Sequence, residues 1–311
     1  MRSVKFVFVK NSFPMKRIVT LVLVVFALST AAEAQVDPLL TTEWSQRAPY
    51  NNLCPTDPKT GEHLLAGCVA IAMAQVINYW QFPVHGIGRK SYQWTNSKGV
   101  KLTLSANLAD TYYRWEDMQT PISVAQLVYH CGVSVMMDYS PSFSGSSEYY
   151  AKDALEVNWG YSGDIRLRAR NSYTDEDWAA LLKEQLDKGW PVIYSSGVHT
   201  FVVDGYNSQG EFHSNQGFGW GGYWETIDQL GSKTSSSAII NIHPDYSSKA
   251  NVAEPTFVVY QNDGKTDVYP AKDLDEINWT PSALTVTQKD ETKQTVPLTN
   301  LSYVMQHQPK Q

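Results

Sequence analysis

Only three cysteines occur among the 311 residues, and the chain has no long basic run. Three cysteines cannot all pair with one another, so at least one is a free thiol or bonds elsewhere. The formal net charge of −6 gives no positive field for nucleic acid, and we expect no such partner. The apolar run at residues 18–28 is too short to span a membrane comfortably.

Residues 1–34 have the pattern of a secretory signal peptide. Basic residues up to Arg17 precede the apolar run, and Ala32-Glu33-Ala34 fits the small-x-small cleavage rule. We expect an exported protein, located outside the cell, in the periplasm or at the cell surface. Its mature chain would begin near Gln35 and would have no integral membrane span.

Apolar material is abundant, because 42% of the residues are hydrophobic and 12% are aromatic. A chain of this length predicts one large domain with a smaller appendage. We expect the main domain over residues 35–248 and a small C-terminal β module over residues 249–311. A change of composition at residues 251–255 marks the linker between them.

Residues 67–80 predict a buried helix with one reactive atom in its first turn, because apolar residues recur at helical spacing. Gly67 allows a tight turn that leaves Cys68 near the helix N-terminus. Unpaired N–H groups and the positive end of the helix dipole favour a thiolate there. A cysteine hydrolase would place its nucleophile at this point. The alternative is a small buried cysteine that packs like alanine.

Helices are expected in the first part of the chain and strands in the second. A second buried helix is predicted over residues 122–135, a third from a cap at Ser146 or Ser147 to about residue 159, and a fourth after Thr174. From residue 189 the spacing of apolar residues is typical of strands, and one strand is predicted at 191–194. A hairpin of residues 199–206 and 211–215 turns at residues 207–210. This order indicates an α+β fold in which the Cys68 helix packs against an antiparallel sheet.

An internal repeat follows residue 255. Residues 257–277 recur 27 positions later, and each unit has the pattern strand, turn, strand, turn, short strand. Nothing catalytic stands out in either unit. A lid, a sorting or partner-binding element, and a cap that completes the fold are all compatible with the pattern.

A cysteine nucleophile needs a base, and the base needs an orienting group. His199 begins the first hairpin strand 131 residues after Cys68 (199 − 68), and Asn215 ends the second. Hairpin pairing can bring these two side chains together. The order and the separation of the cysteine and the histidine are typical of papain-type enzymes.

Three motifs stand in order along the chain. They are Gly67-Cys68-Val69-Ala70 with Ala74-Gln75, His199-Thr200-Phe201-Val202-Val203-Asp204-Gly205, and His213-Ser214-Asn215 ahead of Gly219-Trp220-Gly221-Gly222. With these motifs the chain resembles the streptopain family of secreted bacterial cysteine peptidases, which have a papain-like fold. The similarity spans roughly residues 40–243 in consistent order and includes Gln46.

The resemblance implies a role for each of four residues. Cys68 would be the nucleophile, His199 the general base, and Asn215 the residue that holds the imidazolium. Gln46 would donate to the oxyanion together with the backbone N–H of Cys68, since a carboxamide can stabilise developing negative charge. We expect no cofactor and no metal.

The chain also departs from the family. Gln216 stands where the family usually has Trp after the orienting Asn, and Phe218 or Trp220 could replace that indole. Family members usually carry a long inhibitory propeptide, whereas fewer than a dozen residues separate Ala34 from Trp44. We therefore expect activity without N-terminal processing beyond signal removal. Any restraint would come from a separate inhibitor protein or from residues 250–311.

We therefore predict a secreted cysteine endopeptidase that acts on proteins or peptides through a Cys-His thiolate-imidazolium pair and an acyl-enzyme intermediate. Its thiol should be more acidic than a free cysteine, whose pKa is about 8.5. The alternative is a catalytically degenerate relative that acts as a secreted binding or adhesion protein. A transglutaminase or an amidase with the same Cys-His chemistry is a third possibility.

Overall fold

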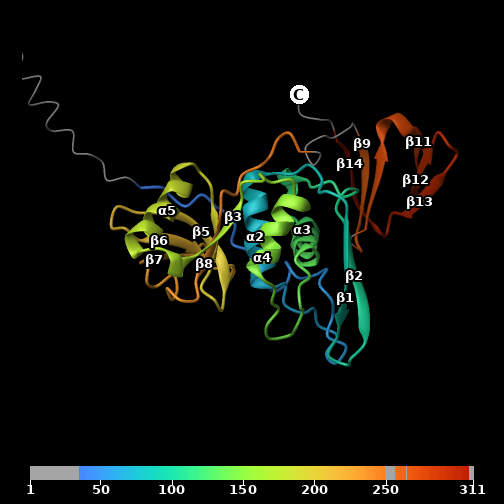
Figure 1. The fold of residues 1–311 in the computed structure, drawn as a ribbon. Helices are drawn as coiled ribbons and strands as arrows, with labels where there is room; N and C mark the ends of the chain where they lie inside the picture. Colours follow the sequence, from blue (N-terminus) through green and yellow to red (C-terminus); the bar gives the residue numbers. More distant parts are fainter. Residues whose placement is uncertain (1–34, 249–255, 264, 308–311) are drawn as a thin grey trace, which may run out of the picture. The chain divides into compact units, whose positions relative to one another are not determined.

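A six-stranded antiparallel sheet is the framework of the computed structural model, which describes residues 35–248, 256–263 and 265–307 (Figure 1). The order of its strands is β3-β8-β4-β5-β6-β7. The expected signal peptide lies outside the described residues. The strands are β3 (Arg166–Ala169), β4 (Val192–Ser195), β5 (Thr200–Tyr206), β6 (Phe212–Asn215), β7 (Tyr223–Glu225) and β8 (Ser237–Ile240).

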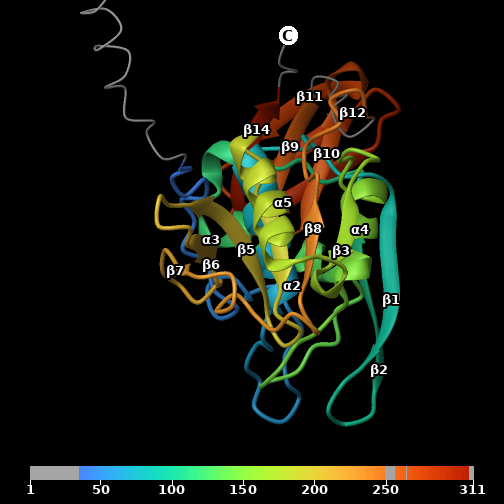
Figure 2. The same ribbon diagram turned by 60° about the vertical axis from the view of Figure 1, so that its left-hand side comes forward.

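Helices cover both faces of this sheet, as Figures 1 and 2 show. Alternate residues of a strand point to opposite faces. Accordingly, Ile193 and Val202 join the core formed by α2 (Cys68–Trp80), α3 (Pro121–Ser134) and α4 (Glu148–Val157). Their neighbours Val192 and Val203 join the core under α5 (Asp175–Asp187). The fold is α+β, as the order of helical and strand patterns predicted.

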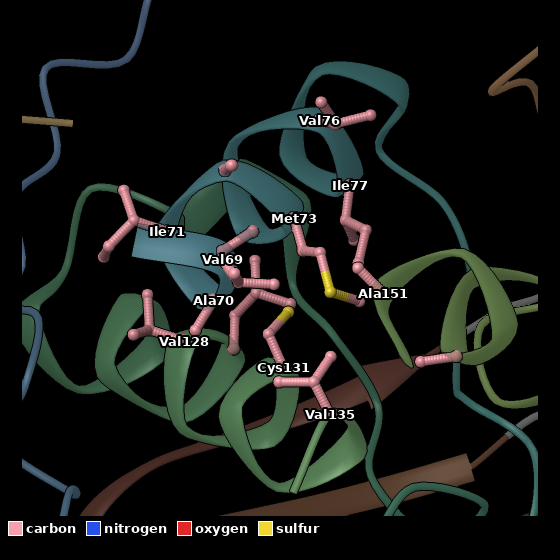
Figure 3. Close-up of a cluster of buried hydrophobic side chains, with 14 of the residues drawn as sticks. Val69, Ala70, Ile71, Met73, Val76, Ile77, Val128, Cys131, Val135 and Ala151 are labelled. Carbon is pink, nitrogen blue, oxygen red and sulfur yellow. The ribbon is translucent and has the colours of Figure 1, made fainter. Parts of the chain in front are cut away.

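The helix α2 is buried along most of its length, as its all-round apolar sequence predicted. Figure 3 shows its side chains against Val128, Cys131 and Val135 of the α3 segment. Ten residues in succession from Cys68 to Ile77 are buried. The first turn of α2 is therefore held between α3 and the sheet, and the position of Cys68 follows from the packing of the whole helix.

Local capping sets the starts of α4 and α5. The Ser147 hydroxyl accepts the backbone N–H of Tyr149, and the Thr174 hydroxyl accepts that of Asp177. The β5–β6 hairpin forms with its turn at residues 207–210, and the strand expected at 191–194 is β4. A second hairpin, β1 (Arg89–Thr95) with β2 (Lys101–Asn107), packs on α3. Short 3-10 helices occur at Trp115–Asp117, Arg170–Ser172 and Ala271–Asp273.

The last part of the chain forms two three-stranded sheets. Corresponding strands begin 27 residues apart (283 − 256, 293 − 266 and 301 − 274). The sheets have the orders β10-β9-β14 and β11-β12-β13, so each repeat gives its third strand to the sheet of the other. The strands are β9 (Thr256–Gln261), β10 (Thr266–Pro270), β11 (Leu274–Trp279), β12 (Ala283–Gln288), β13 (Lys293–Pro297) and β14 (Leu301–His307).

This exchange means that neither repeat completes a sheet alone. Val259 of the first repeat shares a core with Leu284, Val286 and Val296 of the second. The Tyr260 hydroxyl also donates to the backbone carbonyl of Tyr112, outside the repeats. The chain from Val36 onward forms one compact unit, so the division at residues 248 and 249 stays a prediction.

Candidate active site

Cys68 is the first residue of α2, and no side chain caps the helix there. The preceding Gly67 has φ 91°, and a Cβ at that position would lie 2.5 Å from the sulfur of Met137. Only glycine fits this turn without strain. The turn leaves the N–H groups of the first helical residues directed at the nucleophile, and the N–H of Val69 bonds to the Cys68 sulfur.

The start of β5 lies against Cys68. Both the backbone N–H and the hydroxyl of Thr200 reach the Cys68 sulfur. Thr200 directly follows His199, so the backbone that carries the predicted base lies beside the predicted nucleophile. Cys68 is 8% exposed and Thr200 3%, whereas the His199 side chain is partly open to solvent.

A backbone carbonyl orients the imidazole of His199. Its Nε2 lies 2.8 Å from the carbonyl oxygen of Gln216. A carbonyl can only accept a hydrogen bond, so Nε2 carries the hydrogen and Nδ1 is the unprotonated nitrogen of the neutral ring. Phe218 covers the ring, with centroids 4.8 Å apart and planes inclined by 16°. Of the two aromatic candidates, Phe218 takes this position, while Trp220 packs against Tyr223.

Asn215 lies beside the orienting carbonyl, and its carboxamide bonds to other groups. It pairs with Val202 across the hairpin and is 1% exposed. Its Nδ2 donates to the backbone carbonyl of Thr42 at 2.7 Å, and its Oδ1 accepts the N–H of Gly217 at 3.2 Å. These two bonds hold the residues on both sides of Gln216. The partner of His199 Nε2 is the Gln216 carbonyl, so the orienting role expected for Asn215 stays a prediction.

Gln46 lines a pocket of about 290 Å³ together with Gly217 and Phe218. Its backbone carbonyl accepts the N–H of Ala66, which holds it beside the turn that leads into Cys68. The carboxamide has no hydrogen-bond partner in the described part of the chain, so its N–H groups remain available to an oxyanion. Gln46 thus shares a pocket with residues that follow Asn215 in the chain, and the roles of all four predicted residues stay predictions.

Burial favours the neutral forms of both reactive groups. It raises the pKa of the Cys68 thiol, which the N–H groups of Thr200 and Val69 lower in part. It also lowers the pKa of His199, against the opposing effect of the Gln216 carbonyl. The pKa of the Cys68 thiol is thus shifted in the direction opposite to the one expected from the helix N-terminus. The helix N-terminus is present as predicted, but desolvation has the larger effect.

Sequence reasoning missed two features of the site. The acceptor for His199 is a backbone atom, and no residue type marks such an atom in a sequence. The second is Glu148, whose Oε1 accepts the Thr200 hydroxyl at 2.8 Å. The sequence showed only that Glu148 is an acidic residue near the start of a predicted helix. Such a residue usually stabilises the helix through the helix dipole. In the described chain no group of histidine, cysteine and carboxylate side chains is arranged to hold a metal ion.

The three cysteines, Cys54, Cys68 and Cys131, are all free and buried. Burial raises the pKa of Cys54 to about 12 and that of Cys131 well above its ordinary value. These two thiols are therefore inert packing groups. Cys68 differs from them because N–H donors face its sulfur and a histidine stands next to its contact residue.

Comparisons with known proteins agree with this geometry. Residues 44–227 match the model of the Peptidase C10 family. Streptopain from Streptococcus pyogenes is 31% identical in a match that covers 62% of this chain and 54% of that protein. The thiol protease/hemagglutinin PrtT from Porphyromonas gingivalis is 30% identical over 60% of this chain and 22% of its own length. The chain thus spans about half the length of the streptopain that it matches.

Two solved structures from Prevotella intermedia are also similar. The active wild-type interpain A cysteine protease has 33% identity and a TM-score of 0.59, with 66% of this chain and 94% of that chain covered. A fragment of prointerpain A, in a cysteine-to-alanine mutant, has 30% identity and a TM-score of 0.63, with 74% and 81% covered.

Proposed function

Because the chain belongs to the Peptidase C10 family, we propose that it is a cysteine endopeptidase that hydrolyses peptide bonds through Cys68. The observation that carries the proposal is the contact of the Cys68 sulfur with Thr200, the residue next to His199. This contact joins the uncapped start of α2 to the start of β5. It supports a site in which a thiol, a base and N–H donors act together.

The first half of the reaction forms an acyl-enzyme. The thiol proton of Cys68 moves to Nδ1 of His199, which gives a thiolate-imidazolium pair. The sulfur then attacks the carbonyl carbon of the substrate, and the carbonyl oxygen becomes an oxyanion. The backbone N–H of Cys68 and the carboxamide of Gln46 donate to that oxyanion. His199 returns the proton to the leaving amine as the C–N bond breaks, and a thioester remains on Cys68.

The second half releases the acid product. His199, neutral again, takes a proton from water, and the hydroxide oxygen attacks the thioester carbonyl. The Cys68 sulfur leaves and regains its proton from the imidazolium. Throughout, the Gln216 carbonyl holds Nε2, and Asn215 holds the backbone on both sides of that carbonyl.

The test is cleavage of casein by the intact protein and by Cys68→Ala. The variant should lose proteolysis and stay folded, because only a small buried sulfur is removed. A comparable cleavage rate in the variant would refute the mechanism. Labelling by E-64, read as an intact-mass increase at Cys68, separates a peptidase from a binding protein. An inert Cys68 would favour a binding or adhesion role.

The proposal extends to location and domain organisation. In the part of the chain that the structure describes, no helix is long and apolar enough to cross a membrane. Export is supported by the pattern at residues 1–34, and N-terminal sequencing of protein from the culture medium or periplasm would test cleavage near Gln35. We assign the peptidase to residues 35–248 and a β module to 249–311. Limited proteolysis at the linker would test this division.

A further inference from the structure

A carboxylate, a hydroxyl and the nucleophile lie in a row at the candidate active site. Glu148 is the first residue of α4, directly after the Ser147 cap. Its Oε1 accepts the hydroxyl hydrogen of Thr200 at 2.8 Å. The same hydroxyl contacts the sulfur of Cys68. Glu148 is partly exposed and Thr200 is buried, so the row runs from a solvent-accessible carboxylate to the buried nucleophile.

The hydroxyl of Thr200 has a single hydrogen to donate. While that hydrogen is bonded to the Glu148 carboxylate, the oxygen can offer only lone pairs to Cys68. Lone pairs can accept a hydrogen bond from a thiol, but they repel a thiolate. A hydrogen bond donated by the Thr200 hydroxyl to the sulfur lowers the pKa of Cys68. While Glu148 holds that hydrogen, the hydroxyl cannot make this donation, so the arrangement favours the neutral thiol. A hydroxyl released from Glu148 could turn and donate to the thiolate instead.

The charge of Glu148 acts in the same direction. In the described chain it is the one charged group whose field raises the pKa of Cys68. Other titratable groups of the elements packed around the nucleophile are engaged elsewhere or buried in cores. They are Lys152 of α4, paired with Glu156; Asp204 of β5, paired with His213 of β6; and His130 and Cys131 of α3. His199 of β5 is the base itself.

We propose that Glu148 and Thr200 form a positioning pair that holds Cys68 as a neutral thiol while Glu148 is charged. Pairing of Glu148 with a cationic group of the substrate offsets its field at the thiolate and weakens its hydrogen bond with the Thr200 hydroxyl, which can then donate to the thiolate. The pair thus sets the reactivity of the nucleophile without touching the substrate carbonyl. Its relevance to turnover rests on the proposed peptidase function.

The experiment is the pH profile of iodoacetamide alkylation of Cys68 in the full chain, followed by intact mass. Glu148→Gln removes the charge but keeps an acceptor for the hydroxyl. We expect its midpoint about half to one pH unit below that of the wild type, which means about three- to tenfold faster alkylation on the acid side. Glu148→Ala also frees the hydroxyl, and its shift should be larger.

The role of the hydroxyl is tested in a Thr200→Val background. With no hydroxyl to turn, Glu148→Ala and Glu148→Gln should shift the profile equally. Thr200→Ser, which keeps the hydroxyl, should behave as the wild type does. The matched control is Glu156→Gln, a charge removed from the same helix where Lys152 pairs with it. Its profile should superimpose on that of the wild type.

Two results would overturn the proposal. One is a Glu148→Ala profile that coincides with that of the wild type or the control. The other is a difference between the Glu148→Ala and Glu148→Gln shifts that persists with Val at position 200. Near-ultraviolet circular dichroism confirms that each variant is folded. Hydrolysis of a fluorogenic peptide, measured alongside, tests the proposed peptidase function separately from the proposed Glu148–Thr200 pair. A shift without hydrolysis by the wild type refutes only the peptidase, and hydrolysis without a shift refutes only the pair.

Discussion

Two histidines stand on the β5–β6 segment of the chain, and their surroundings differ. His213 is buried in β6, and its Nδ1 lies 2.6 Å from Oδ1 of Asp204, a carboxylate with no exposed surface. His199 precedes β5, and its partner is a neutral backbone carbonyl. Phe218 stacks on its ring, and the side chain is partly exposed. A carboxylate clamps the first imidazole in place. The second is oriented without a charge, which leaves its proton free to move.

One hairpin thus carries a histidine with a structural role, His213, and a histidine proposed to act in catalysis, His199. Oδ2 of Asp204 also accepts the backbone N–H of Leu40, so the His213 pair ties the N-terminal segment to the sheet. The contacts of His199 lead instead to the loop at residues 216–218 and, through Thr200, to Cys68. The predictions below test this division, from the largest expected effect to the smallest.

Replacing His199 should have the largest effect on activity. We expect His199→Ala to lower kcat by at least about 10³-fold, because the base of both half-reactions is lost. The melting temperature should change little, since the side chain is partly exposed. His213→Ala should show the reverse pattern, with a clear loss of stability. Peptide hydrolysis and thermal unfolding of both variants check the comparison, and equal activity losses at both positions would contradict it.

Removing Asp204 should affect stability more than chemistry. Asp204→Ala leaves the N–H of Leu40 and the imidazole of His213 without their buried acceptor. We expect a loss of about 2–4 kcal/mol in the free energy of unfolding. Urea denaturation measures it. At urea concentrations below the unfolding transition, the folded variant should be alkylated at Cys68 as fast as the wild type. A slower rate would show that the surroundings of His213 and His199 are not independent.

Asn215→Ala should lower kcat by about 10-fold to 10³-fold with little change in KM, because the loop that carries the Gln216 carbonyl loses both of its anchors. Asn207→Ala is the matched control, since Asn207 also bonds to backbone N–H groups but lies in the turn at the far end of the hairpin. Its effect on kcat should be mild. Similar losses for the two variants would argue that Asn215 has no special link to His199.

Phe218→Ala should have the smallest effect. Burial lowers the pKa of His199, and removal of the stacked ring exposes the imidazole, so its pKa should rise toward the ordinary value of about 6.5. The base is active when neutral, so the acid limb of the kcat/KM profile should move to higher pH. We expect a two- to fivefold loss near pH 6 and a loss of at most about 1.3-fold at pH 7, where an imidazole with the ordinary pKa is mostly neutral. Imidazole NMR titration gives the pKa, and Trp220→Ala, which leaves the His199 ring covered, should not move it.

Short-range patterns predicted the elements of the site well. The helix at residues 67–80 was predictable because its apolar spacing and Gly67 act within a few residues of one another. Three other features were also predictable from patterns in the sequence. They are the Thr174 cap, the hairpin turn at residues 207–210 and the 27-residue spacing of the last strands. Motif order also predicted that Cys68 and His199 act together, which stays a prediction.

Only the tertiary structure decided how these elements meet. It chose a backbone carbonyl over the Asn215 side chain as the partner of His199, and Phe218 over Trp220 as its cover. It also brought Glu148 to Thr200 from 52 residues away, and it exchanged β11 and β14 between the repeats. The direction of the Cys68 pKa shift belongs here too. Desolvation sums the effects of many distant neighbours, and a carbonyl has the same chemistry in every residue, so neither leaves a pattern in the sequence.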